Sequence, residues 1–250
     1  MKVISLGWGV QSFTLAAMVA LGEIEPVDYA IHADTTHESS LTYSFAKRWT
    51  GWLENKGLVV VVVATHEKHN VIDKWGGMQL PAFTASAKGD GQIRRQCTQE
   101  WKIKPMRQWL QKHRNGERIE QWIGISLDEF QRMRESDVQY ITNRYPLIEK
   151  RMTRQDCIKW LVEHNLEVPP KSACTFCPFH TTREWREVKS IPADWKEAVD
   201  VDRMIRMARP PAELFIHPSR KPLDEVDFRT AEEKGQLRLW DNECSGICGV

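Results

Sequence analysis

The chain has 250 residues, of which 41% are hydrophobic and 28% are charged, so it is long enough to bury one substantial core. Its 35 Lys and Arg against 34 Asp and Glu give a formal charge of +1, which excludes a strong overall field that would draw the protein onto nucleic acid. The sequence contains no run of about 20 apolar residues, and its first residues lack the order of a signal peptide. We therefore expect a cytoplasmic protein with no membrane partner.

The first half of the chain alternates short β-branched runs with helical patterns. Continuous apolar runs predict buried parallel strands at residues 3–6, 29–33, 58–64 and 122–125. Helical periodicity predicts helices at residues 13–21 and 41–53. This β-α-β-α-β order predicts an α/β fold with a doubly wound, mostly parallel, Rossmann-like sheet and helices on both faces. Its ligand site would lie beyond the carboxyl ends of the strands.

The second half is predicted to be helical. Thr153 is the expected N-cap of a helix that reaches His164, and further helices are predicted at residues 181–189 and 194–207. We accordingly predict a nucleotide-binding α/β domain at residues 1–145. A helical portion at residues 146–250, which carries most of the cysteines, is predicted to pack on it.

A loop of small residues follows the first predicted strand. Gly7 and Gly9 allow backbone N–H groups to approach a phosphate, and Ser12 would open the next helix with a hydroxyl at its positive end. The alternative is a tight turn that needs its glycines only for steric reasons. The loop lacks the Lys of a Walker loop and the third glycine of the dinucleotide fingerprint, so both of those cofactor classes are disfavoured.

Polar residues occur at other positions where a ligand is expected. Asp34 follows the second predicted strand, where a carboxylate would hold a ribose hydroxyl or Mg²⁺, or would serve as a cap or turn residue. Basic residues cluster around Cys97 and suit a phosphate or sulfate, although a solvated charged face is the alternative. This basic cluster consists of Arg94, Arg95, Lys102, Lys104 and Arg107.

Six cysteines are too few, in a chain of this length, for a secreted disulfide framework. Cys174 and Cys177 have the spacing with which two thiolates from one turn bind one metal, and thiolates favour zinc or iron–sulfur clusters. His180 would extend this pair into a zinc site, and a redox disulfide is a third alternative. Cys157 lies within a predicted helix and is expected to be buried.

The loop Gly7-Trp8-Gly9-Val10-Gln11-Ser12 resembles the pyrophosphate-binding loop Ser-Gly-Gly-x-Asp-Ser of the phosphoadenylyl-sulfate (PAPS) reductase and N-type ATP pyrophosphatase superfamily. It departs from that pattern at Gly7, Trp8 and Gln11. Four further segments occur in the order of the family: Ala33-Asp34-Thr35 with Glu38, Arg95-Gln96-Cys97-Thr98 followed by Lys102-Ile103-Lys104-Pro105, Gly124, and Tyr145-Pro146-Leu147.

The resemblance implies an adenine nucleotide, either ATP or adenylyl sulfate, with Mg²⁺ as a further ligand. The nucleotide-binding residues would be Gly7, Trp8, Gly9, Gln11, Ser12, Asp34, Thr35 and Gly124. Family members with a C-x-x-C motif commonly hold a [4Fe–4S] cluster. Its ligands here would be Cys97, Cys174, Cys177 and Cys248, with zinc as the alternative metal.

The tail segment Glu243-Cys244-Ser245-Gly246 is similar to the Glu-Cys-Gly of sulfonucleotide reductases, in which the thiolate attacks the activated sulfate. Carried over, Cys244 is the nucleophile, and Arg95 and Lys102 complete the catalytic set. Ser245 and the additional Cys248 depart from the family, so Cys244 and Cys248 are alternatively metal ligands that close the site.

Three functions remain open at this point. The first is reduction of activated sulfate by an enzyme that uses a thiol reductant. The second is ATP-dependent transfer of sulfur, from a sulfur donor and through an iron–sulfur site, to a nucleic acid. The third is a zinc-braced nucleotide-binding module without catalysis, which Gln11 in place of the loop Asp favours. Self-association into a homo-oligomer is compatible with each of them.

Overall fold

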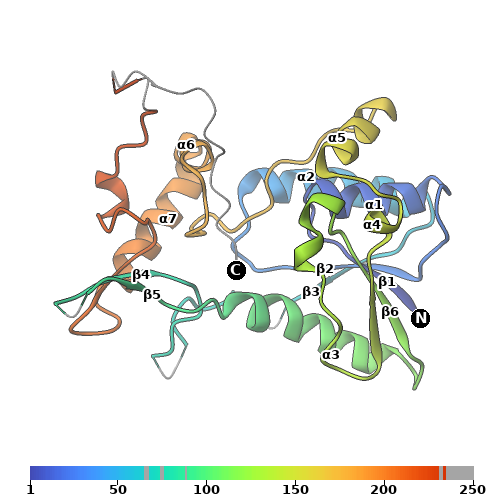
Figure 1. Ribbon diagram of the computed structural model, residues 1–250, viewed down its shortest axis with the longest axis horizontal. Helices are drawn as coiled ribbons and strands as arrows, with labels where there is room; N and C mark the ends of the chain where they lie inside the picture. The colour runs from blue at the N-terminus through green and yellow to red at the C-terminus, as the bar shows by residue number, and fades with distance from the viewer. Residues whose placement is uncertain (65–67, 74–75, 88, 231–232, 235–250) are drawn as a thin grey trace.

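The computed structural model describes residues 1–64, 68–73, 76–87, 89–230 and 233–234. Its centre is a five-stranded sheet in which every neighbouring pair of strands is parallel (Figure 1). In sheet order the strands are β3 (Val60–Val63), β2 (Tyr29–Ala33), β1 (Lys2–Ser5), β6 (Ile119–Ile123) and β7 (Ile141–Arg144). The chain moves outward from β1 in both directions, which confirms the predicted doubly wound α/β fold.

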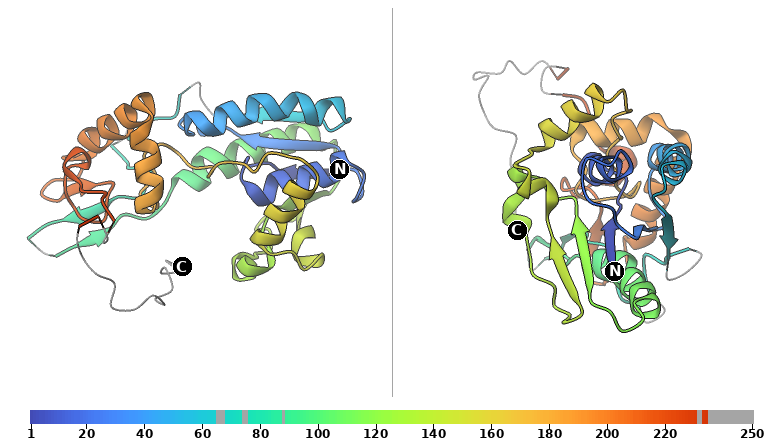
Figure 2. Two further views of the ribbon diagram at one scale, coloured as in Figure 1. Left: turned by 90° about the horizontal axis from the view of Figure 1, so that it is seen from above. Right: turned by 90° about the vertical axis from the view of Figure 1, so that its right-hand side faces the viewer.

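Helices cover both faces of this sheet (Figure 2). On one face, Ile4 of β1 belongs to an apolar core with α1 (Val10–Ala20), α2 (Ser40–Asn55) and α5 (Arg154–Glu163). On the other face, Val3 packs in a core with α3 (Lys104–His113). This alternation is the period of two that strand geometry imposes on side chains. The short helix α4 (Pro146–Glu149) follows β7.

Local signals fix the ends of several helices. The Ser39 side chain caps α2, and Thr153 caps α5 in a reciprocal capping box with Asp156, as predicted for Thr153. Cys157 of α5 is completely buried, which confirms its predicted packing role. Among the described residues, we find no helical stretch with the length and hydrophobicity that crossing a bilayer requires.

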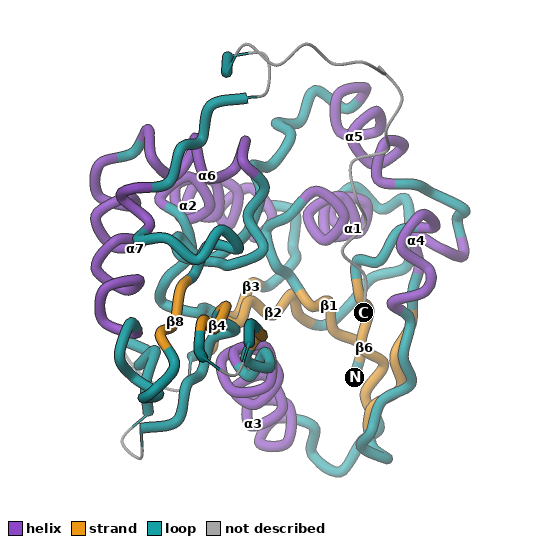
Figure 3. Tube along the Cα trace, turned by 60° about the vertical axis from the view of Figure 1, so that its left-hand side comes forward, coloured by secondary structure: helices purple, strands orange, loops and turns teal. Residues whose placement is uncertain are grey.

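A second hydrophobic core lies beside the sheet and contains its own small antiparallel sheet, beside α7 (Figure 3). Its elements are β4 (Phe83–Ala85), β5 (Gly91–Gln92), β8 (Glu213–Phe215), α6 (Thr182–Ser190), α7 (Pro192–Ile205) and the 3-10 turn Leu223–Glu225. Residues from Val71 to Trp101 share this core with residues from Phe176 to Phe228. The predicted division at residue 145 stays a prediction, and the cores themselves join segments from both sides of it.

Candidate functional site

The β1–α1 loop is closed by a hydroxyl. Ser12 Oγ accepts a hydrogen bond from the Gly7 N–H at 3.1 Å and donates to the Gly9 carbonyl at 3.2 Å. The first N–H groups of a helix have no acceptor within the helix. Gly9, the N-cap of α1, has no side chain that could accept from them. These groups lie at the carboxyl end of β1, as the predicted phosphate site requires.

Trp8 is the anchor of this loop. Its backbone is left-handed, with φ of 57°, and its side chain is 1% exposed. The indole packs against Phe13, Phe45 and His32. Burial of the indole in the core offsets the cost of the left-handed backbone. The predicted contact of Trp8 with a nucleotide would therefore be made by its backbone, since the side chain is enclosed.

Gly124 permits a close approach between β6 and α1. A methyl group at this position would lie 2.7 Å from the Ser12 nitrogen and 2.8 Å from its Cα. Both are backbone atoms, which cannot move aside as a flexible side chain would. Gly124 therefore supports the loop through packing, and its predicted role in the nucleotide site is indirect.

Gln11 is directed toward the residues that follow β6. Its amide nitrogen donates to a Glu129 carboxylate oxygen at 3.1 Å and to Ser126 Oγ at 3.4 Å. Glu129 lies in the 3-10 turn Leu127–Arg132. The side chain of Gln11 thus connects α1 to the 3-10 turn that follows β6.

Asp34 stabilises the turn after β2. Its Oδ1 accepts from the Thr36 N–H and from the Tyr43 hydroxyl, both at 2.7 Å, and Thr36 has φ of 61°. Burial, followed by the hydrogen bond to Asp34, raises the pKa of Tyr43 far above its ordinary value. These contacts match the turn role that was the alternative to a ligand role for Asp34.

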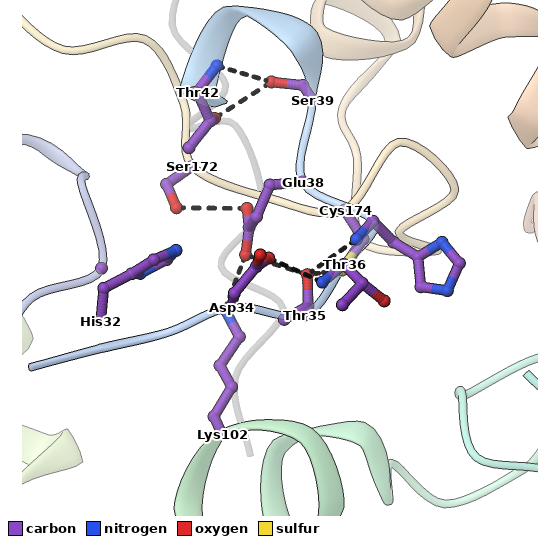
Figure 4. Close-up of polar contacts among 12 residues, drawn as sticks. His32, Asp34, Thr35, Thr36, Glu38, Ser39, Thr42, Lys102, Ser172 and Cys174 are labelled. Carbon is purple, nitrogen blue, oxygen red and sulfur yellow. Dashed lines mark hydrogen bonds and ion pairs between the residues drawn. The ribbon is translucent and has the colours of Figure 1, made fainter. Parts of the chain in front are cut away.

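Glu38 is the centre of the polar contacts at this end of the sheet (Figure 4). Its Oε1 accepts from Lys102 Nζ and from Thr35 Oγ1, both at 3.3 Å. Its Oε2 accepts from Ser172 Oγ at 3.4 Å. The side chain of Glu38 is 1% exposed, whereas that of Lys102 is 37% exposed. A buried carboxylate is thus balanced by a cation that reaches solvent.

Lys102 reaches Glu38 from a π-helical turn, Thr98–Ile103, that leads into α3. π-helical turns are rare in proteins, and those that occur are often found at functional sites. Burial acts to lower the pKa of Lys102, but the negative charge of Glu38 and the hydrogen bond to it act in the opposite direction, and the pKa is raised overall. The ammonium group therefore stays protonated at neutral pH.

The segment of Cys174 runs antiparallel to the chain after β2. The Thr175 N–H donates to the His37 carbonyl at 2.9 Å, and the Ser39 N–H donates to the Ala173 carbonyl at 3.1 Å. The Cys174 thiol lies 3.3 Å from Thr35 Oγ1. Burial, strengthened by the Glu38 charge, raises the pKa of Cys174 well above its ordinary value, so the group is a neutral thiol.

The predicted basic cluster is only partly brought together. Lys104 pairs with Glu100 at 2.8 Å, and Arg107 pairs with Asp137. Arg95 is exposed, and its guanidinium lies 5.7 Å from the centre of the Phe179 ring. Of the five basic residues, Lys102 is the one that reaches the buried contacts at the end of β2.

The described residues do not assemble a metal centre. Within them, no three His, Cys, Asp or Glu side chains are arranged to hold a metal ion, although Cys97, Cys174 and Cys177 are all included. His180 Nε2 donates to the Cys174 carbonyl at 2.9 Å, so this nitrogen is already used. Cys244 and Cys248 lie outside the described residues. The metal site stays a prediction.

Ser172 and Tyr43 belong to the site but were not predicted. Ser172 also lies over the β1–α1 loop, because its Cβ is 3.9 Å from the point where a Cβ of Gly9 would be. The Ser172 contact with Glu38 spans 134 residues of sequence, and no local pattern marks it. Tyr43 carried a weak signal, since it lies one turn into the helix that follows Asp34.

The sequence matches no protein-family model, and no curated protein is similar to it. Among solved structures, the phosphate complex of the PAPS reductase from Candida auris is similar, with a TM-score of 0.48 and 11% sequence identity. The match covers 69% of this chain and 80% of the reductase chain. This likeness assigns no reaction or ligand to the chain.

Proposed function

We propose that this protein is an enzyme that binds an adenine nucleotide at the β1–α1 loop and reduces an activated sulfate. The observation that supports this most is the arrangement around Ser172. This residue lies over Gly9 of the loop on one side and contacts Glu38, the partner of Lys102, on the other. A helix N-terminus and a protonated lysine are thus presented around one site at the carboxyl ends of the strands.

In this proposal one set of residues binds the phosphate, and another compensates the negative charge that forms during the reaction. The free N–H groups of α1 would hold the phosphate, and Ser12 would keep the loop in its binding form. Lys102 and Arg95 would compensate the negative charge that develops on oxygen as the sulfur–oxygen bond breaks. The adenine moiety is proposed from the family resemblance of the loop.

The chemical step is proposed from the resemblance of the Cys244 segment. The Cys244 thiolate attacks the sulfur of the bound adenylyl sulfate, a sulfur–sulfur bond forms, and the sulfur–oxygen bond breaks. The electron pair of the broken sulfur–oxygen bond leaves with the adenosine phosphate. A thiol reductant then attacks the Cys244 sulfur and releases sulfite, and a second thiol reduces the resulting mixed disulfide.

The test is to incubate the full chain with adenylyl sulfate and dithiothreitol and to measure sulfite and adenosine phosphate. We expect turnover by the wild type and a loss of more than about a thousandfold in Cys244→Ser, because the nucleophile is removed. Cys157→Ala, which changes a buried cysteine in α5, is the control and should keep its activity.

Two results would contradict the proposal. Sulfite formation that is unaffected in Cys244→Ser would exclude this cysteine as the nucleophile. Release of AMP and pyrophosphate from ATP, without turnover of adenylyl sulfate, would support the ATP-dependent sulfurtransferase instead.

A further inference from the structure

The two ends of the five-stranded sheet differ in how they are protected. β7 forms one end and β3 forms the other. The unpaired N–H and C=O groups of an edge strand can pair with another chain, and natural proteins prevent this with polar or charged residues on the edge. β7 has such residues at three of its four positions, Thr142, Asn143 and Arg144. β3 is four valines, and residues 58–64 contain no polar or charged side chain.

The β3 edge is also exposed on both faces of the sheet. Val60 packs toward the core of α2, whereas Val61 and Val63 pack toward the core of α3. Because side chains alternate along a strand, Val62 lies on the face of Val60, and Val59 lies on the face of Val61. Val62 is 60% exposed and Val59 is 49% exposed. Each face therefore presents one exposed valine beside the edge.

The backbone of β3 has its free hydrogen-bonding groups in the same place. The Ala30 N–H donates to the Val59 carbonyl, and the Asp34 N–H donates to the Val63 carbonyl, both at 2.9 Å. Residues 59, 61 and 63 thus direct their backbone groups toward β2. The pleat of the strand then directs the N–H and C=O groups of Val60 and Val62 outward, away from the sheet.

We propose that β3 pairs antiparallel with β3 of a second copy of this chain, so that the two sheets become one. With Val60 opposite Val62 of the second copy, a two-fold axis passes beside Val61. The outward groups of Val60 and Val62 then form about four hydrogen bonds between the copies. Each exposed Val62 is covered by Val60 of the other copy, and each exposed Val59 is covered by Val63 of the other copy.

A second copy fits this edge because the edge is complementary to itself. The partner strand must be apolar, uncharged and of similar length. Among the described residues, the other edge strands are polar or very short: β7, β5 with two residues, and β8, which begins with Glu213. Pairing of β3 with any of these would join the copies head to tail, which leaves an open chain unless the rotation closes a ring. Pairing of β3 with itself closes at a dimer.

The proposed dimer should be reversible. One pair of short strands buries less than the roughly 1,200 Å² at which specific stable interfaces begin. We therefore expect a dissociation constant in the micromolar range rather than the nanomolar range. The inference concerns the edge of the sheet and does not depend on the proposed nucleotide site.

The first experiment is sedimentation equilibrium of the full chain at increasing protein concentration. The wild type should rise from its chain mass of 29.1 kDa to twice that value. Val62→Lys should raise the dissociation constant by at least about tenfold, because dimerisation would bury an unpaired ammonium group. The exposure of Val62 lets this variant fold. Val162→Lys is the matched control, since Val162 on α5 is also 60% exposed, and it should dimerise like the wild type.

Hydrogen exchange shows whether the dimer forms at this edge. The backbone amide of Val60 should exchange more slowly at high than at low concentration of the wild type, and equally fast at both concentrations in Val62→Lys. A wild type that keeps a mass of 29.1 kDa at the highest concentration would overturn the proposal, because a second copy would then not occupy the edge. Dimerisation of Val62→Lys as strong as that of the wild type, or exchange at Val60 that ignores concentration, would place the contact elsewhere and also overturn it.

Discussion

The β1–α1 loop and the segment around Cys174 meet in one site, but different kinds of structure hold them. The loop belongs to the five-stranded sheet, and the buried Trp8 and the close approach of Gly124 fix its backbone. The Cys174 segment joins the sheet to the second core and is fixed mainly by hydrogen bonds to the chain after β2. A site of this kind has one side fixed by packing and another side fixed by polar contacts.

The largest expected effect comes from breaking the packed side. Gly124→Ala places a methyl group against the Ser12 backbone, so the loop or β6 must shift. We expect a loss of about 1–3 kcal/mol in the free energy of unfolding, which is typical of overpacking, together with loss of ATP binding. Urea denaturation and titration with ATP measure the two effects.

Gly51→Ala is the matched control, because Gly51 lies within α2 and a methyl group there meets no atom within 4 Å. This change should leave ATP binding intact and raise the free energy of unfolding by up to about 1 kcal/mol. If Gly124→Ala behaved like Gly51→Ala, the packing account of the loop would be wrong.

A smaller effect should appear in the dependence of stability on pH. Burial lowers the pKa of His32, a buried residue of β2 whose Nδ1–H donates to the Leu6 carbonyl at 3.0 Å. The unfolded chain then binds a proton near pH 6.5, whereas the native ring stays neutral. Stability that is present above about pH 6.5 is therefore lost as the pH falls below it.

His32→Gln should lose less stability than the wild type between pH 7 and pH 5 in urea denaturation. His113→Gln, at an exposed position on α3, should show the same loss as the wild type. An unchanged pH profile in His32→Gln would show that His32 does not stay neutral in the folded protein.

The packed side of the site could be predicted from sequence because its signals are local. Continuous apolar runs indicated β1, β2, β3 and β6, and Gly7, Gly9 and Ser12 indicated the loop between β1 and α1. The edge strand β7 was missed because Ile141–Arg144 contains polar residues at three of its four positions. Helix α3 was missed because Pro105, in its first turn, and the basic residues around it were interpreted as a binding motif.

The polar side could be predicted only in part. Glu38, Lys102 and Cys174 were each marked by a motif, but nothing in the sequence showed that they belong to one chain of contacts. Their arrangement depends on a π-helical turn and on pairing between segments more than 130 residues apart. Very short elements such as β5, with two residues, leave no periodicity to detect.

The proposed function depends above all on binding of the phosphates of an adenine nucleotide at the β1–α1 loop. The most direct test is titration of the wild type, Ser12→Ala and Ser190→Ala with ATP. We predict that Ser12→Ala weakens binding about five- to tenfold, since one hydrogen bond that orders the loop contributes about 1 kcal/mol. Ser190→Ala, at the far end of α6, should bind like the wild type. Equal ATP affinity in all three proteins, or no binding by the wild type, would contradict the account.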